Sequence, residues 1–169
     1  METYCGRGIY GPTLSKIQTM KQKVALYGIS LMIMTSLHHA YGAWLYGTPW
    51  RLQILAFSLP VIILNWIYVK QTRYSKALYY LFCTANLVLS IWFIGLYEGV
   101  YNHLFKNLLF FAGVNGQTMA SLFPPPMYEM PNDFLFELTG VLQAFIVVPL
   151  GYYFIVMLAS QRMKRQNGH

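Results

Sequence analysis

The stretch LQILAFSLPVIILNWIYVKQTRYSKALYYLFCTANLVLSIWFIGLY, residues 52–97, decides the fold. It contains two apolar runs, Leu52–Val69 and Ala77–Tyr97, joined by a short polar connection with three basic residues. Each run is close to the roughly 20 residues of helix that cross a bilayer core of about 30 Å. The stretch therefore predicts two transmembrane helices that run in opposite directions, because spanning segments must satisfy their backbone polar groups internally.

Two further runs, Val24–Gly47 and Phe134–Ala159, have similar length and apolarity. The 169-residue chain is 56% hydrophobic and 10% charged, which leaves too few ionisable groups to solvate a small soluble domain. The sequence predicts an all-α membrane protein, a four-transmembrane-helix bundle that forms a single integral membrane domain over residues 1–169. A shorter interrupted run, about 98–114, is predicted to form an additional amphipathic helix in the interface on the non-cytoplasmic face.

Basic residues flank the predicted spans unevenly. All of the 12 lysines and arginines except Arg51 and Lys106 precede the first span, connect the second to the third, or follow the fourth. The positive-inside rule therefore places both termini in the cytoplasm. The segment Met1–Lys23 does not resemble a cleavable signal, and we expect a bacterial inner membrane. The net charge of +7 lies beside apolar spans, which favours membrane lipids over nucleic acid as partners.

Five ionisable side chains fall at the predicted outer level of the membrane. His38 and His39 lie in the outer half of the first span, Glu98 and His103 at the end of the third, and Glu137 about one turn into the fourth. Charged groups inside a bilayer are costly, so each is a candidate functional residue. Imidazoles combined with carboxylates suit iron, copper or zinc, and two helix-borne histidines could also ligate haem. We predict these five residues as metal ligands.

The spacing of these residues matches no specific metal motif such as H-E-x-x-H or C-x-x-C-H. Because neighbours on a helix point about 100° apart, we expect one of His38 and His39 to face the bundle and the other a neighbouring helix. A carboxylate at Glu137 must pair with a group from another helix, bind a cation or hold a proton. Glu137 and His103 are the predicted catalytic acid–base groups.

Other polar residues at this level have simpler predicted roles. On a regular helix, Glu98, Asn102 and Lys106 form one row and His103 and Asn107 the next, a face that either caps the bundle or meets water. Arg51 is expected to pair with Glu98, with Glu137 or with a lipid phosphate, and Asp133 to cap the fourth helix. The proline-rich segment 123–133 is predicted to form a rigid lid, a docking strap or an ordinary stiff loop.

Three classes of function remain open. The first is a metal-dependent enzyme, such as an oxidoreductase, that acts on a lipophilic small molecule. The second is a metal-free lipid or sterol-type isomerase or binding protein. The third is a non-catalytic subunit of a homo-oligomer or a larger membrane complex, in which small residues allow helices to pack closely. The glycines considered for that role are Gly42, Gly95, Gly140 and Gly151.

Overall fold

The structure, a computed structural model, describes residues 11–71, 75–125 and 127–166. Its elements are α1 (Gly11–Leu45), η1 (Pro49–Ile54), α2 (Leu55–Lys70), α3 (Lys76–Thr84), η2 (Ala85–Phe105), α4 (Lys106–Phe111), α5 (Gly116–Leu122) and α6 (Phe134–Gln166). The described residues contain no strand, and the all-α prediction is confirmed.

Three helical segments are long and apolar enough to cross a membrane: Pro49–Lys70, Lys76–Phe111 and Phe134–Arg162. They correspond to the second, third and fourth predicted spans, and they are compatible with an integral membrane protein. The helix α1 is 35 residues long but carries His38 and His39 within its apolar part, and it is not among the three.

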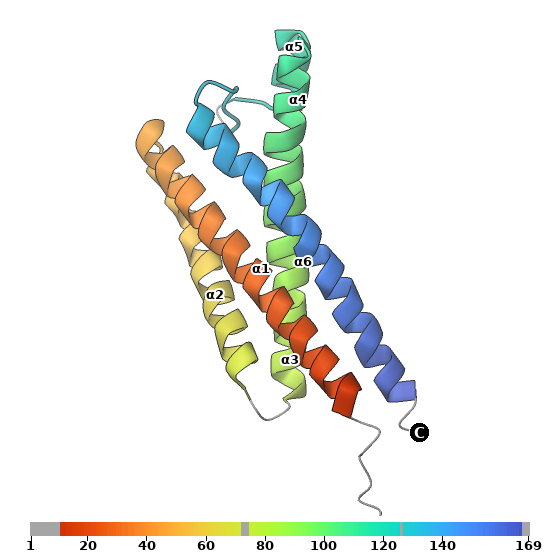
Figure 1. Cartoon of the computed structure of the whole chain (residues 1–169). Coiled ribbons are helices and arrows are strands. Elements are labelled where there is room, and N and C mark those ends of the chain that lie inside the picture. The colour runs from red at the N-terminus through yellow and green to blue at the C-terminus, as the bar shows by residue number, and fades with distance from the viewer. Residues whose placement is uncertain (1–10, 72–74, 126, 167–169) are drawn as a thin grey trace, which may run out of the picture.

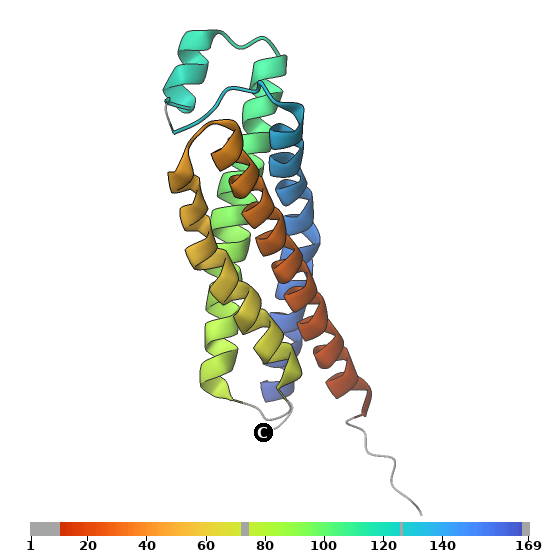
Figure 2. The same cartoon turned by 90° about the vertical axis from the view of Figure 1, so that its left-hand side faces the viewer.

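The helices are arranged side by side in a bundle (Figure 1). Helix α1 packs against α6 and α2, and α6 also packs against η2. The start of α1, the end of α2, the start of α3 and the end of α6 lie together at one end of the bundle. The other end, where α1 finishes and α6 begins, is called the site end below. Figure 2 shows α5 and the segment after it lying over the site end.

Local sequence explains where several helices stop and start. Gly47 adopts a φ of 61° just after α1, the left-handed conformation in which glycine commonly ends a helix. The Ser75 hydroxyl accepts a hydrogen bond from the Leu78 N–H and caps α3. Asp133 Oδ1 accepts from the Phe136 N–H at 2.8 Å, which confirms the predicted cap of α6.

A separate interfacial helix over residues 98–114 is not confirmed. Residues 98–111 continue the third apolar helix without a break, so that α3, η2 and α4 form one segment from Lys76 to Phe111. The seven-residue α5 follows this segment as a separate helix. The polar residues after Tyr97 are therefore carried on the same helix as the third span.

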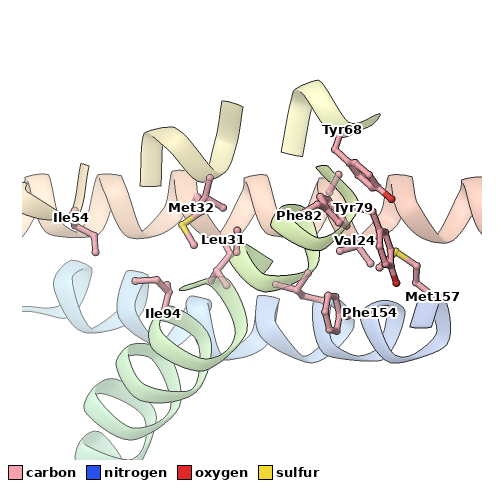
Figure 3. Packing of buried hydrophobic residues seen from close by; sticks show 14 residues of the cluster. Val24, Leu31, Met32, Ile54, Tyr68, Tyr79, Phe82, Ile94, Phe154 and Met157 are labelled. Atoms are coloured by element: carbon pink, nitrogen blue, oxygen red, sulfur yellow. The ribbon is translucent and has the colours of Figure 1, made fainter. Parts of the chain in front are cut away.

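The apolar core fills the half of the bundle away from the site end and extends to Ile54, at the end of η1, near the site end. Figure 3 shows its side chains meeting between the helices; the labelled members are Val24, Leu31, Met32, Ile54, Tyr68, Tyr79, Phe82, Ile94, Phe154 and Met157. Large apolar side chains such as Ile33, Trp66 and Ile155 remain exposed on the outside of the helices. This distribution is expected when the surrounding solvent is lipid.

A polar layer within this half is internally hydrogen-bonded. Asn86 Nδ2 donates to Asn65 Oδ1 at 3.1 Å, which links η2 to α2, and also to the Phe82 carbonyl. Asn65 Nδ2 donates to the Val61 carbonyl at 2.8 Å, and Ser90 Oγ donates to Asn86 Oδ1 at 3.5 Å. The layer is best explained as a helix-packing feature, since interhelical hydrogen bonds stabilise bundles in lipid.

Candidate functional site

The structure brings the five predicted site residues together at the site end. His38 and His39 come from α1, Glu98 and His103 from η2, and Glu137 from α6. One carboxylate oxygen, Glu98 Oε1, lies at the centre: it is 3.8 Å from His38 Nε2, 3.5 Å from His39 Nε2 and 3.5 Å from His103 Nε2. Segments distant in sequence therefore converge on one buried group.

Three of these residues meet a geometric requirement for holding one ion. His38, Glu98 and His103 each offer one ligand atom, and these atoms lie within 4.8 Å of one another. The His38 and His103 side chains are buried and that of Glu98 is 13% exposed. Two imidazoles and one carboxylate are a donor set that transition metals accept readily.

Both adjacent histidines approach the same carboxylate on a neighbouring helix. Their ring planes are 89° apart, and both Nε2 atoms lie within 4 Å of Glu98 Oε1. His38 is fully buried, whereas the His39 side chain is 14% exposed at the edge of the cluster. His39 is therefore a peripheral member of the group and not a residue that faces away from it.

The winding of η2 places Glu98 and His103 on one face. This segment is π-helical, with bonding between residues five apart, so positions 98 and 103 face the same way. The regular-helix prediction, which put them in different rows, was wrong for this reason.

Hydrogen bonds define which nitrogen of His38 carries a proton. The Thr139 hydroxyl has a single proton, and its oxygen lies 2.8 and 3.0 Å from the backbone carbonyls of Leu135 and Phe136. When the proton is donated to one of these carbonyls, the hydroxyl accepts from His38 Nδ1 at 3.0 Å, and we assign the hydrogen of the His38 ring to Nδ1 on that basis. In a neutral ring, His38 Nε2 then presents a lone pair toward Glu98.

The same logic applies to His103. Its Nδ1 lies 2.9 Å from Glu137 Oε2, and an ionised carboxylate can only accept, so Nδ1 donates. In a neutral ring His103 Nε2 is left with a lone pair that also points toward Glu98. A histidine held through one nitrogen by a carboxylate, with its other nitrogen free, is the usual arrangement behind a metal ligand.

Glu137 is held by partners that the sequence did not pair with it. Lys106 Nζ lies 3.2 Å from Oε1, and Asn107 Nδ2 donates to Oε2 at 2.6 Å. Lys106 is 1% exposed and Asn107 is 9% exposed, so, of the two alternatives predicted for their helix face, the one in which it meets water is wrong. Instead this face points into the bundle, while Leu108 and Phe111 face outward. Of the roles predicted for Glu137, pairing with another helix is present.

Arg51 does not pair with Glu98 or Glu137. Its Nη2 contacts Glu129 Oε1 at 3.3 Å, and its guanidinium lies over the rings of Tyr46, Trp50 and Phe136. Glu129 belongs to the proline-rich segment 123–133, called the strap below. Arg51 therefore attaches the strap to η1 and does not neutralise the Glu98 or Glu137 carboxylate.

The strap has two further attachments near the site. The backbone carbonyl of Glu129 accepts a hydrogen bond from Lys106 Nζ at 2.5 Å, so Lys106 joins the strap to Glu137. Tyr128 and Tyr97 share a hydrogen bond through their hydroxyls. Burial and this bond raise the pKa of Tyr128, which keeps its hydroxyl neutral. The segment is therefore attached to the bundle through Arg51, Lys106 and Tyr97.

Small residues let the helices approach at the site. A Cβ at Gly140 would meet the imidazole ring of His103, and one at Gly42 would meet the ring of Phe136 at 2.5 Å. A Cβ at Gly95 would meet Val147. Three of the four glycines predicted to permit close packing therefore do so, whereas a Cβ at Gly151 would meet nothing within 4 Å.

Unpartnered polar atoms are concentrated around this cluster. Among the described residues, eight buried side-chain nitrogen or oxygen atoms have no hydrogen-bond partner in the protein: Thr35 Oγ1, His38 Nε2, His39 Nδ1, Asn102 Oδ1, His103 Nε2, Asn107 Oδ1 and both amide atoms of Gln143. Each such atom costs about 1–3 kcal/mol. Gln143 and Thr139 were not predicted as site residues, because a single amide or hydroxyl in an apolar helix is usually a packing residue.

Comparisons with known protein families, with curated proteins and with solved structures find no match to this chain. The functional argument therefore rests on the chemistry of the site.

Proposed function

We propose that this chain is a four-span integral membrane protein with both termini in the cytoplasm and the site end on the opposite face. Support comes from the arrangement of the ends: the start of α1, the end of α2, the start of α3 and the end of α6 lie together, and the chain concentrates its basic residues near these points. The bacterial inner membrane remains our proposed location.

We propose further that the site end binds one divalent transition-metal ion through His38, Glu98 and His103. The observation that carries this proposal is the convergence of two unpartnered imidazole nitrogens on one carboxylate oxygen, each histidine being fixed by a bond at its other nitrogen. Lone pairs and a carboxylate that face one another in a buried space repel unless a proton or a cation lies between them.

The charge balance favours a cation. The Glu137 carboxylate is compensated by the Lys106 ammonium at 3.2 Å. For Glu98 the corresponding contacts in the described structure are to the three histidines, and Asn102 donates to its other oxygen at 3.1 Å. A divalent ion would balance Glu98 and leave a single surplus charge, to which a bound anion or hydroxide could respond.

The donor set narrows the choice of ion. Imidazole and carboxylate suit Fe²⁺ or Zn²⁺. Copper(I) prefers thiolate or thioether ligands, and neither is among the converging groups. Haem fits less well, since the ring centroids of His38 and His103 are 4.5 Å apart and a porphyrin between them would need more room. We therefore favour a bare ion with three protein ligands, His38, Glu98 and His103, with His39 at the edge of the group.

The site is suited to an enzyme that acts on a lipophilic substrate. A bound ion would supply Lewis-acid or redox chemistry beside the substrate. The chain itself would bind and orient: Glu137 fixes the His103 ring through Nδ1, and Lys106 holds Glu137 in place. The same carboxylate is the group we propose for accepting and returning a proton during turnover.

A test begins with protein purified in detergent without a metal-affinity tag. Bound elements are measured by mass spectrometry for the wild type, His38→Ala, His103→Ala and Glu98→Gln, with Glu129→Gln as the matched control outside the cluster. We expect about one Fe or Zn ion per chain, lost in the three site variants and kept in the control. A folded wild-type protein that binds no ion when supplied with Fe²⁺, Zn²⁺ or Cu²⁺ refutes the metal proposal.

One observation favours a second candidate. His103 lies between two carboxylates, at 2.9 Å from Glu137 and 3.5 Å from Glu98, an arrangement that could exchange protons with a lipid in a metal-free isomerase. Lipid conversion that persists after exhaustive chelation supports this candidate over the metalloenzyme. A folded protein with neither metal nor lipid conversion leaves the non-catalytic subunit as the remaining hypothesis.

A further inference from the structure

Two fully buried polar side chains lie just below the proposed metal ligands. Thr35 on α1 and Gln143 on α6 are both 0% exposed, and neither side chain has a hydrogen-bond partner in the protein. Thr35 is three residues before His38, and Gln143 is four residues after Thr139, which bonds His38. Each residue is thus about one helical turn from the site, on the side away from the strap.

The packing of α1 against α6 places these two residues at the same level. The helices run in opposite directions (Figure 1), and their register is fixed at two points. The Gly42 position faces the Phe136 ring, and the His38 ring bonds Thr139 one turn lower. Continuing by one more turn down both helices brings Thr35 opposite Gln143.

The third wall of this region comes from η2. A Cβ at Gly99 would lie 2.6 Å from the Ala144 backbone nitrogen and 3.1 Å from Gln143 Cβ, so η2 passes directly beside Gln143 one residue after Glu98. The polar groups added here carry no charge: one hydroxyl and one amide. Together they offer donors and acceptors to a neutral partner and nothing to compensate an ion.

Away from the site end, no buried side-chain polar atom of the described residues lacks a hydrogen-bond partner. The layer of Asn65, Asn86 and Ser90, farther from the site end, is joined by side-chain hydrogen bonds. Thr35 and Gln143 could each be apolar at no loss of a bond in the protein. Unpaired groups in hydrocarbon surroundings are costly, so their retention beside a candidate metal site indicates a ligand.

We propose that Thr35 and Gln143 form a subsite that binds the uncharged, oxygen-bearing head of a lipophilic ligand, a hydroxyl or carbonyl group, next to the metal ligands. This inference rests on the proposed function and specifies its substrate class. The amide of Gln143 donates to and accepts from the head, the Thr35 hydroxyl completes the hydrogen bonding, and Glu98 with His38 lies one turn above. A neutral head is selected because the subsite holds no charge of its own.

The test uses full-length protein in detergent and four probes with the same alkyl chain: decane, decanol, decanamide and decanoate. Binding is followed by the shift of the thermal unfolding midpoint, and metal content is measured in the same samples. We expect decanol and decanamide to stabilise the wild type more than decane or decanoate. In Gln143→Leu and Thr35→Val this preference falls about tenfold in apparent affinity, the loss of roughly one hydrogen bond, while metal content is unchanged. Ser90→Ala, a buried hydroxyl removed from the paired layer, keeps the preference.

The outcomes separate this inference from the metal proposal. A wild type that binds metal but shows no preference among the four heads overturns the subsite alone. A preference that survives in Gln143→Leu also overturns it, since the amide then does not contact the head. Should the wild type lack metal yet retain a preference that Gln143→Leu abolishes, the subsite stands and the metal proposal fails.

Discussion

Replacement of Gly140 by alanine tests the geometry of the site through a single methyl group. A Cβ at this position would enter the imidazole ring of His103, which is 1% exposed and fixed by Glu137. Because the ring cannot leave the interior, either the ring or α6 must shift. Overpacking of this kind costs about 1–3 kcal/mol, and replacing glycine by alanine in a helix returns up to about 1 kcal/mol.

The chain provides a matched control on the same helix. At Gly151 an added Cβ would meet nothing within 4 Å, so Gly151→Ala keeps the gain in helix propensity without the collision. The difference between the two variants therefore isolates the overpacking term, about 1–3 kcal/mol in the free energy of unfolding. Unfolding of both variants in mixed micelles, followed by circular dichroism, measures it directly.

The same substitution should weaken metal binding. Moving the His103 ring displaces Nε2, which lies 3.5 Å from Glu98 Oε1, and disturbs its bond to Glu137. Loss of such a supporting interaction typically reduces metal affinity about 10- to 100-fold. Competition with a chelator of known affinity measures the change in Gly140→Ala against Gly151→Ala. Equal stability and equal metal affinity in the two variants would refute the packing described for His103.

Three further predictions concern the groups around the ligands. Thr139→Val removes the acceptor that fixes His38 Nδ1, and we expect about a 10- to 100-fold loss of metal affinity in chelator competition, with the fold retained. Lys106→Met leaves the Glu137 carboxylate without its ammonium partner and should cost about 3–5 kcal/mol of unfolding free energy; adding Glu137→Gln should recover part of that loss in denaturation measurements. Metal affinity should fall as the pH is lowered, since protons compete for the unbonded imidazole nitrogens, and titration with Zn²⁺ across pH measures the slope.

Much of the site was predictable because intramembrane charge is rare and informative. The five site residues were predicted only from the free-energy cost of placing ionisable side chains in a membrane. The structure brings all five together at one end of the bundle: His38, His39, Glu98, His103 and Glu137. Of the four spans that the apolar runs predicted, three correspond to helices that are long and apolar enough to cross a membrane. Both inferences depend on composition and run length, which a sequence states directly.

The contacts within the site were not predictable, since they depend on winding and register. A regular-helix wheel separates Glu98 from His103, whereas the π-helical winding of η2 brings them together. Lys106 belongs to a polar face that a helix wheel turns toward water, yet it is buried because its partner, Glu137, lies on another helix. Pairing of that kind is a property of the folded chain and leaves no local pattern.

The contrast between two polar regions in one bundle gives the functional argument its strength. Asn65 and Asn86 show that this fold can bury amides in hydrogen-bonded pairs between helices. Around His38 and His103 the same helices leave nitrogens unpaired while fixing each ring at its other nitrogen. Hydrogen bonds at the other ring nitrogens hold both imidazoles so that their free nitrogens face one carboxylate, and this arrangement is preorganised to bind an ion. The unpaired atoms are thus better explained as the inner surface of a binding site than as a cost of folding.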